Sequence, residues 1–217
     1  MKFFLRLLTV SVFSFYVNNG KAQTIIYVDA AASGLNDGSS WANAYTSLDA
    51  AFLKETAITN KDTIKVAQGI YKPSSIPFDL ITNDPRDAAF LMPLHGNILG
   101  GYASNGTRDP KRFPTILSGD IGKSNDSTDN SYHVLLFVNS EAALNGFTIE
   151  KGNASGNGNF QIDTIGIKKN EGGAIYFYRS FSNLSEVIFK DNMAGSGGAC
   201  SINVSSESYF SNCFYFV

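Results

Sequence analysis

The densest group of acidic side chains lies in the stretch SGDIGKSNDSTDN, which carries Asp120, Asp126 and Asp129. Carboxylate oxygens at this density are suitable ligands for Ca²⁺. Their spacing does not follow the D-x-[DN]-x-[DN]-G pattern of a calcium-binding loop. A solvated turn is therefore favoured over a metal site. Calcium is the only cofactor for which the sequence offers candidate ligands.

Acid–base chemistry finds little support in the sequence. A glycoside hydrolase needs two carboxylates flanking the scissile bond, and a polysaccharide lyase needs a basic side chain beside calcium. In the repeat alignment given below, Glu150 falls beside Lys190 and Tyr215, so no acidic column forms. His133 stands alone at the start of a predicted strand, where a turn residue is favoured over a catalyst. We therefore name no catalytic residue.

Aromatic side chains provide the candidate ligand-binding residues. In the stretch NEGGAIYFYRS, Tyr176 and Tyr178 alternate with Ile175 and Phe177, which predicts that both tyrosines line an outer sheet face. There they could stack on a glycan or pair with neighbouring strands, and the sequence leaves both alternatives open. Trp41 could also stack on a sugar, but its place beside a predicted helix favours packing.

Targeting is indicated by the first residues, MKFFLRLLTVSVFSFYVNNGKAQ. Lys2 and Arg6 give a basic start, an apolar run follows, and small residues at positions 20 and 22 predict cleavage after Ala22. The run is short for a membrane span and has no later counterpart, so a signal peptide is favoured over an anchor. We expect an exported protein without a transmembrane segment.

Composition narrows the function classes. Without its first 22 residues the chain carries 14 basic and 19 acidic residues, a net charge of −5, which argues against nucleic acid as a partner. Abundant Gly, Asn, Ser, Thr and aromatic residues favour short strands joined by turns. With only two cysteines the chain is no disulfide scaffold, and we expect Cys200 to face inward and Cys213 outward, which disfavours a bond between them.

An internal repeat organises the second half of the chain. Gly-Gly-Ala recurs after 25 residues at positions 172 and 197, and a shift of 40 residues relates Leu144 to Leu184. Three units are visible, near 132–154, 172–194 and 197–217. The first two are separated by about 15 extra residues, in which we expect an excursion loop.

The apolar residues within each unit alternate with period two, which indicates strands with one buried face. Units of about 25 residues fit the turns, or rungs, of a parallel β-helix, whose equivalent side chains stack in columns inside a narrow core. The predicted columns are Leu135–Ile175–Cys200 and Ile149–Phe189–Phe214. The Gly-Gly pairs are then corners before a strand, because no helix follows them as a phosphate-binding loop requires.

The first half supplies the start of this coil. Residues 24–30 and 62–71 are predicted strands, and in the second of them Ile64 and Val66 share a face. Between them, Leu48, Ala51 and Phe52 follow helical spacing, with Thr46 or Ser47 as the N-cap. One early amphipathic helix is suited to cover the first rung, although an ordinary surface helix fits the pattern equally.

Several blocks carry a family resemblance. The segments YVDAAASGLNDGSSWANAYTSLDAA, DTIKVAQGIYKP, ILGGYASNGTRDPKRFPTILSGDIG and ALNGFTIEKGNA resemble the N-terminal part of secreted right-handed parallel β-helix proteins of Gram-negative bacteria. Gly-Gly-Ala-Ile and Phe189-Lys-Asp-Asn192 also resemble the GGA[I/L] and FxxN repeats of polymorphic outer-membrane proteins. The resemblance covers nearly the whole mature chain. It implies the pectate-lyase-like fold and a secreted or cell-surface address, and most members have no established activity.

The sequence thus predicts an all-β chain with a signal peptide at 1–22, a strand and capping helix at 23–61, and β-helix rungs at 62–217. Since the chain stops within a rung, we expect it to be a fragment. The favoured function is a non-catalytic surface passenger, adhesin or glycan-binding stalk, with a polysaccharide or cell-surface glycan as partner. The alternative is a polysaccharide lyase or glycoside hydrolase whose active groove continues in further rungs.

Overall fold

The computed structural model describes residues 24–55, 62–77 and 84–216, which form parallel β-sheets with little helix. The leader expected at 1–22 lies outside these ranges. Within them, no helix is long and apolar enough to cross a membrane. The chain is therefore all-β, as predicted, and the strands of its three larger sheets are all parallel.

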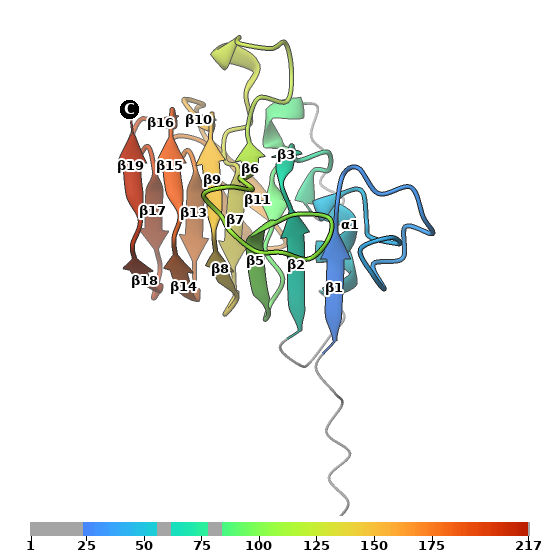
Figure 1. Cartoon of the computed structure of the whole chain (residues 1–217). Helices are drawn as coiled ribbons and strands as arrows, with labels where there is room; N and C mark the ends of the chain where they lie inside the picture. The colour runs from blue at the N-terminus through green and yellow to red at the C-terminus, as the bar shows by residue number, and fades with distance from the viewer. Residues whose placement is uncertain (1–23, 56–61, 78–83, 217) are drawn as a thin grey trace, which may run out of the picture.

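Three sheets run side by side along the stack (Figure 1). Sheet A contains β1 (Ile25–Val28), β2 (Thr63–Ala67), β5 (Asn97–Tyr102), β8 (Ala143–Asn145), β14 (Phe181–Ser185) and β18 (Glu207–Ser211). Sheet B contains β3 (Gly69–Tyr71), β6 (Thr115–Ser118), β9 (Phe147–Glu150), β15 (Ile188–Lys190) and β19 (Phe214–Phe216). Sheet C contains β4 (Phe90–Leu91), β7 (Leu135–Val138), β13 (Ile175–Tyr178) and β17 (Cys200–Asn203).

From β7 onward the chain visits sheets C, A and B in the same order three times, and each strand pairs with its counterpart in the next unit. The small pair β10 (Asn153–Ala154) and β16 (Met193–Ala194) repeats in the same way. The column Leu135–Ile175–Cys200 is confirmed by the register of sheet C. Short 3₁₀ helices, Pro85–Asp87 and Ser127–Asp129, occur in the connections.

The second predicted column is only partly correct. Ile149 pairs with Phe189, but Phe189 then pairs with Tyr215 instead of Phe214. The offset grows from 25 to 26 because two residues, Val204 and Ser205, occupy the corner that Arg179 fills alone one unit earlier.

That extra residue also corrects the prediction for Cys213. Cys213 lies at the position equivalent to buried Val187 of the preceding unit, and it packs against the main core instead of facing outward. Cys200 packs against the same core, and burial raises the pKa of its thiol. Both cysteines are free thiols, although the inward–outward argument against a bond was wrong.

Except at Val204–Ser205, each of the following corners between sheets is made by one residue with positive φ. Arg179 stands below Asn139 between sheets C and A, and Glu186 stands between Gly146 and Asn212 in the column joining sheets A and B. The Gly-Gly motif serves the same purpose, since Gly172 has a φ of 69°. Parallel stacking repeats the same bend in each unit. The residue at each corner must therefore adopt a positive φ, whatever its type.

The helix α1 (Leu48–Glu55) lies at the end of the stack where β1 runs, far from the C-terminus (Figure 1). It begins directly after the two predicted capping residues. Its buried side chains Leu48, Ala51 and Phe52 join the main core, and the rings of Phe52 and Phe90 lie 6.2 Å apart. The predicted amphipathic helix is confirmed, and it covers apolar side chains of the first units.

The insertion between the first two repeats is an antiparallel hairpin rather than an irregular loop. Its strands are β11 (Asn159–Ile162) and β12 (Ile165–Lys168). Phe160, Ile162 and Ile167 are buried in a second apolar cluster together with Leu136 and Tyr176 of sheet C. The hairpin therefore packs on the outer face of sheet C and covers Leu136 and Tyr176 there.

Candidate functional site

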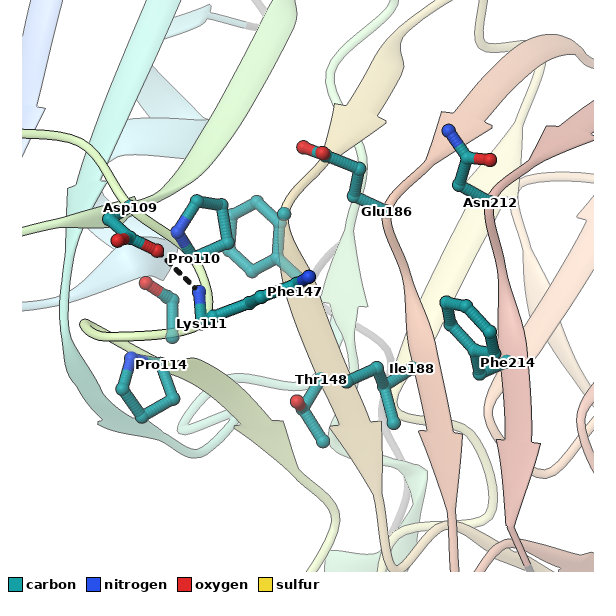
Figure 2. Close-up of a pocket in the computed structure, with 12 residues that line it drawn as sticks. Asp109, Pro110, Lys111, Pro114, Phe147, Thr148, Glu186, Ile188, Asn212 and Phe214 are labelled. Atoms are coloured by element: carbon teal, nitrogen blue, oxygen red, sulfur yellow. Dashed lines mark hydrogen bonds between the residues drawn. The ribbon is translucent and has the colours of Figure 1, made fainter.

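A groove of about 460 Å³ lies on the outer face of sheet B (Figure 2). Its floor follows outward positions that are paired in register from strand to strand, Thr148, Ile188 and Phe214. Thr148 is preceded in the same column by Ile116 of β6. Phe214 is 59% exposed, so its ring is available to a ligand.

The connection between β5 and β6 forms one wall of the groove and contributes Asp109, Pro110, Lys111 and Pro114 (Figure 2). Pro110 packs so closely on β5 that a Cβ at Gly101 would lie 2.6 Å from its Cγ. The backbone N–H of Asp109 donates to the carbonyl of Gly101 at 2.8 Å, and the Asp109 carboxylate accepts from the N–H of Lys111 at 3.1 Å. These contacts fix the wall, because the loop folds onto itself and onto the sheet.

Polar groups line the corner side of the groove. Glu186 and Asn212 project from the column of positive-φ residues that begins with Gly146. Arg108 donates from Nε to the carbonyl of Gly100 at 2.9 Å, donates to the Asn145 side chain, and lies 3.8 Å from a Glu186 carboxylate oxygen. The corner therefore offers charged acceptors and donors beside an apolar floor.

This combination suits a ligand with both an apolar face and hydroxyl groups. Neighbouring strands lie about 4.8 Å apart, so successive floor residues repeat at that distance along the stack. Aromatic and aliphatic side chains bind the C–H face of a sugar ring, while the rim fixes its hydroxyls by hydrogen bonds. The arrangement can hold consecutive rings of an extended chain.

The two tyrosines predicted to bind a ligand, Tyr176 and Tyr178, lie outside this groove. The prediction that Tyr176 is accessible to a ligand was wrong. Tyr176 points away from the main core, as the alternation required, but it is only 2% exposed because the β11–β12 hairpin covers it. Burial raises the pKa of its hydroxyl. Tyr178 is half-buried against the same cluster. In the insertion, the apolar residues Phe160 and Ile162 alternate with polar ones. This pattern predicts a strand with one buried face, and it could have indicated that the insertion covers Tyr176.

His133 lies in the connection just before β7, as predicted, and its side chain is buried. It is 1% exposed, with its ring 5.9 Å from Phe160 and 5.4 Å from Tyr176. Its Nδ1 lies 2.9 Å from the carbonyl oxygen of Gly172, which can only accept a hydrogen bond. The imidazole therefore carries its proton on Nδ1, and burial lowers its pKa to about 4.

The candidate calcium ligands are not brought together. Asp120 is buried and ion-paired with Lys151 at 2.8 Å, and the hydrogen bond from that lysine lowers the pKa of the carboxyl group. Asp126 caps a 3₁₀ helix, and Asp129 accepts from the N–H of Lys123 at 2.7 Å. Within residues 24–55, 62–77 and 84–216, no group of three or more His, Cys, Asp or Glu side chains is arranged to hold a metal ion.

Trp41 packs as predicted, with ring centroids 4.9 Å from Tyr27 and 5.4 Å from Tyr102. The amino group of Lys65 lies over both tyrosine rings, at 5.9 and 5.7 Å. The indole ring is therefore already engaged by protein side chains.

A polar cluster that the sequence did not indicate fastens the end of the hairpin. Lys169 lies 2.7 Å from Asp87 and 3.2 Å from Asp84, and Tyr132 donates to Asp84 at 2.9 Å. Asp87 is 1% exposed, so its charge depends on nearby partners. The cluster joins residues more than 80 positions apart, a distance at which sequence spacing carries no information.

In comparisons with known proteins, no protein-family model, no curated protein and no solved structure matches this chain.

Proposed function

We propose that this protein is an exported, non-catalytic surface protein that binds an extended glycan in the groove on sheet B. The observation that carries the proposal is the floor of Thr148, Ile188 and Phe214, which repeats once per unit beside a polar rim. The repeat of about 4.8 Å is close to the length of one sugar ring in an extended polysaccharide. Consecutive rings would then meet equivalent positions of consecutive strands.

We also propose a specific fold, the right-handed parallel β-helix, and a location outside the cell. The order C, A, B, repeated three times, supports a parallel β-helix, and we propose the right-handed form of the secreted proteins that the sequence resembles. Export rests on the signal-peptide pattern of residues 1–22. A stalk or adhesin that presents a groove along its side is consistent with both.

The test is retention of the protein in gels that contain soluble neutral or acidic polysaccharides, followed by titration with oligosaccharides of the best polymer. Phe214→Ala should weaken binding by about tenfold, because loss of one stacked aromatic ring corresponds to about 1–2 kcal/mol. Ile188→Asp should weaken it further, since it places a charge in the floor. Both side chains face outward, so the variants should fold normally.

Tyr209→Ala is the matched control, because Tyr209 is 67% exposed on sheet A and lies outside the groove. It should bind as the unchanged protein does. Retention by no polysaccharide, or equal retention of all three variants, would contradict glycan binding in this groove. Release of unsaturated or shortened products during the titration would instead identify an enzyme.

A further inference from the structure

A second cavity, of about 360 Å³, lies at the opposite end of the sheet B strands. It is formed where the chain leaves these strands, by Asp120 after β6, Lys151 after β9 and Met193 after β15. The segment that contains Asn125 and Asn130 closes another side. None of these residues lines the groove, so the two cavities are separate.

Asn130 is the observation that indicates a ligand. Its side chain lines the cavity and is 4% exposed, yet its Oδ1 has no hydrogen-bond partner among the residues that the structure describes. A buried acceptor left without a partner destabilises the folded chain, because it has lost its hydrogen bonds to water. A ligand in the cavity that donates a hydrogen bond would remove this cost.

The charges around the cavity limit what that ligand is. Asp120 lies 2.8 Å from the amino group of Lys151 and 3.8 Å from that of Lys72. Asp191 lies 3.7 Å from the amino group of Lys190. Each carboxylate therefore has a cation beside it, which leaves little attraction for a metal ion or an ammonium group.

The ligand must donate a hydrogen bond to Asn130 and must not be a cation. A neutral ligand with hydroxyl groups meets both requirements, because a hydroxyl donates to amide and carboxylate oxygens and accepts from lysine. The side chain of Met193, 58% exposed, adds an apolar surface for C–H groups. The volume is within the range of small-ligand sites. We propose that this cavity binds a single neutral sugar residue, and the proposal uses different side chains from the groove.

The experiment records amide NMR spectra of the ¹⁵N-labelled chain during titration with methyl β-D-glucoside, methyl β-D-galactoside and methyl α-D-mannoside. At least one glycoside should shift the amide signals of Asn125, Asn130 and Gly152 in a saturable manner. Asn130→Leu should weaken that binding by about tenfold, since it removes the acceptor and fills the space. Met193→Ala should weaken it by a smaller factor, and because this side chain is exposed the variant should fold.

Phe214→Ala serves as the control and should leave these shifts unchanged, which separates this site from the groove. The proposal is overturned if no glycoside shifts these signals, or if Asn130→Leu and Met193→Ala bind as tightly as the unchanged chain. It is equally overturned if calcium chloride alone produces the saturable shifts, since the cavity would then be a cation site.

Discussion

Acidification should destabilise this protein through His133. The buried imidazole has a pKa of about 4 in the folded chain, below its ordinary value of 6.5. Between these values the unfolded chain binds a proton that the folded chain does not. Stability must therefore fall as the pH drops through this window, and the loss is complete below the folded pKa.

The magnitude follows from the two pKa values. Lowering the pH from about 7.5 to about 5 should cost about 2 kcal/mol through this residue alone. At about pH 4 the cost is about 3 kcal/mol, and it rises only slightly at lower pH. The physical reason is that protonation would place a cation beneath the hairpin, near Lys169, in a site without access to water.

The assay compares urea unfolding of the unchanged chain and of His133→Asn, followed by circular dichroism across this pH range. Asparagine keeps a donor near the carbonyl of Gly172 but does not titrate. It loses the ring contacts with Phe160 and Tyr176 at every pH, so that loss shifts its curve by a constant amount. All other titrating groups are shared and cancel in the difference.

The stability advantage of the unchanged chain over His133→Asn should therefore shrink by about 2 kcal/mol between about pH 7.5 and 5. A difference that stays constant within about 0.5 kcal/mol would refute the assignment of a buried, neutral imidazole. An advantage that grows on acidification would mean that the folded state favours the protonated ring.

Three further predictions concern stability, each measured by urea unfolding. Gly152→Ala should prevent folding or cost several kcal/mol, because its Cβ would lie 1.8 Å from the carbonyl oxygen of Gly173. Val204→Gly should stabilise the protein by about 1 kcal/mol, since a β-branched residue is strained at a φ of 38°. Lys169→Met should cost about 3–5 kcal/mol, because it removes a cation 2.7 Å from the buried carboxylate of Asp87.

Matched controls separate these causes from general sensitivity. Gly158→Ala should cost only about 1 kcal/mol, because its positive φ of 75° strains an alanine but no atom lies within 4 Å of the added Cβ. Lys168→Met removes a lysine paired with Glu171 at 2.6 Å, yet that lysine is 48% exposed and its charge is screened by water, so the loss of stability should be much smaller than for Lys169→Met. A control as damaging as its partner variant would contradict the packing or burial argument.

The sequence determined the helix, the strands of the repeated units and most of their register. Side chains in a strand alternate with period two, and parallel stacking requires equivalent residues to recur at a fixed offset. Leu135 and Ile175 could therefore be placed in one column from spacing alone, and the structure pairs them. The Gly-Gly corner was equally accessible, because few other residues tolerate positive φ.

Tertiary structure decided what local patterns cannot encode. One extra residue at Val204–Ser205 moved Cys213 from the outer face to the core, since a shift by one residue exchanges the two faces of a strand. The alternation correctly placed Tyr176 outside the main core, yet only the folded hairpin shows that this side is covered.

The candidate site follows the same division. The floor positions Thr148 and Ile188 were fixed by the repeat, because equivalent residues of parallel units must stack. The wall of the groove depends on how the β5–β6 connection packs against Gly101 and Gly146. The contact of Pro110 with Gly146 joins residues distant in the sequence, so only the three-dimensional structure could turn an exposed sheet face into a groove.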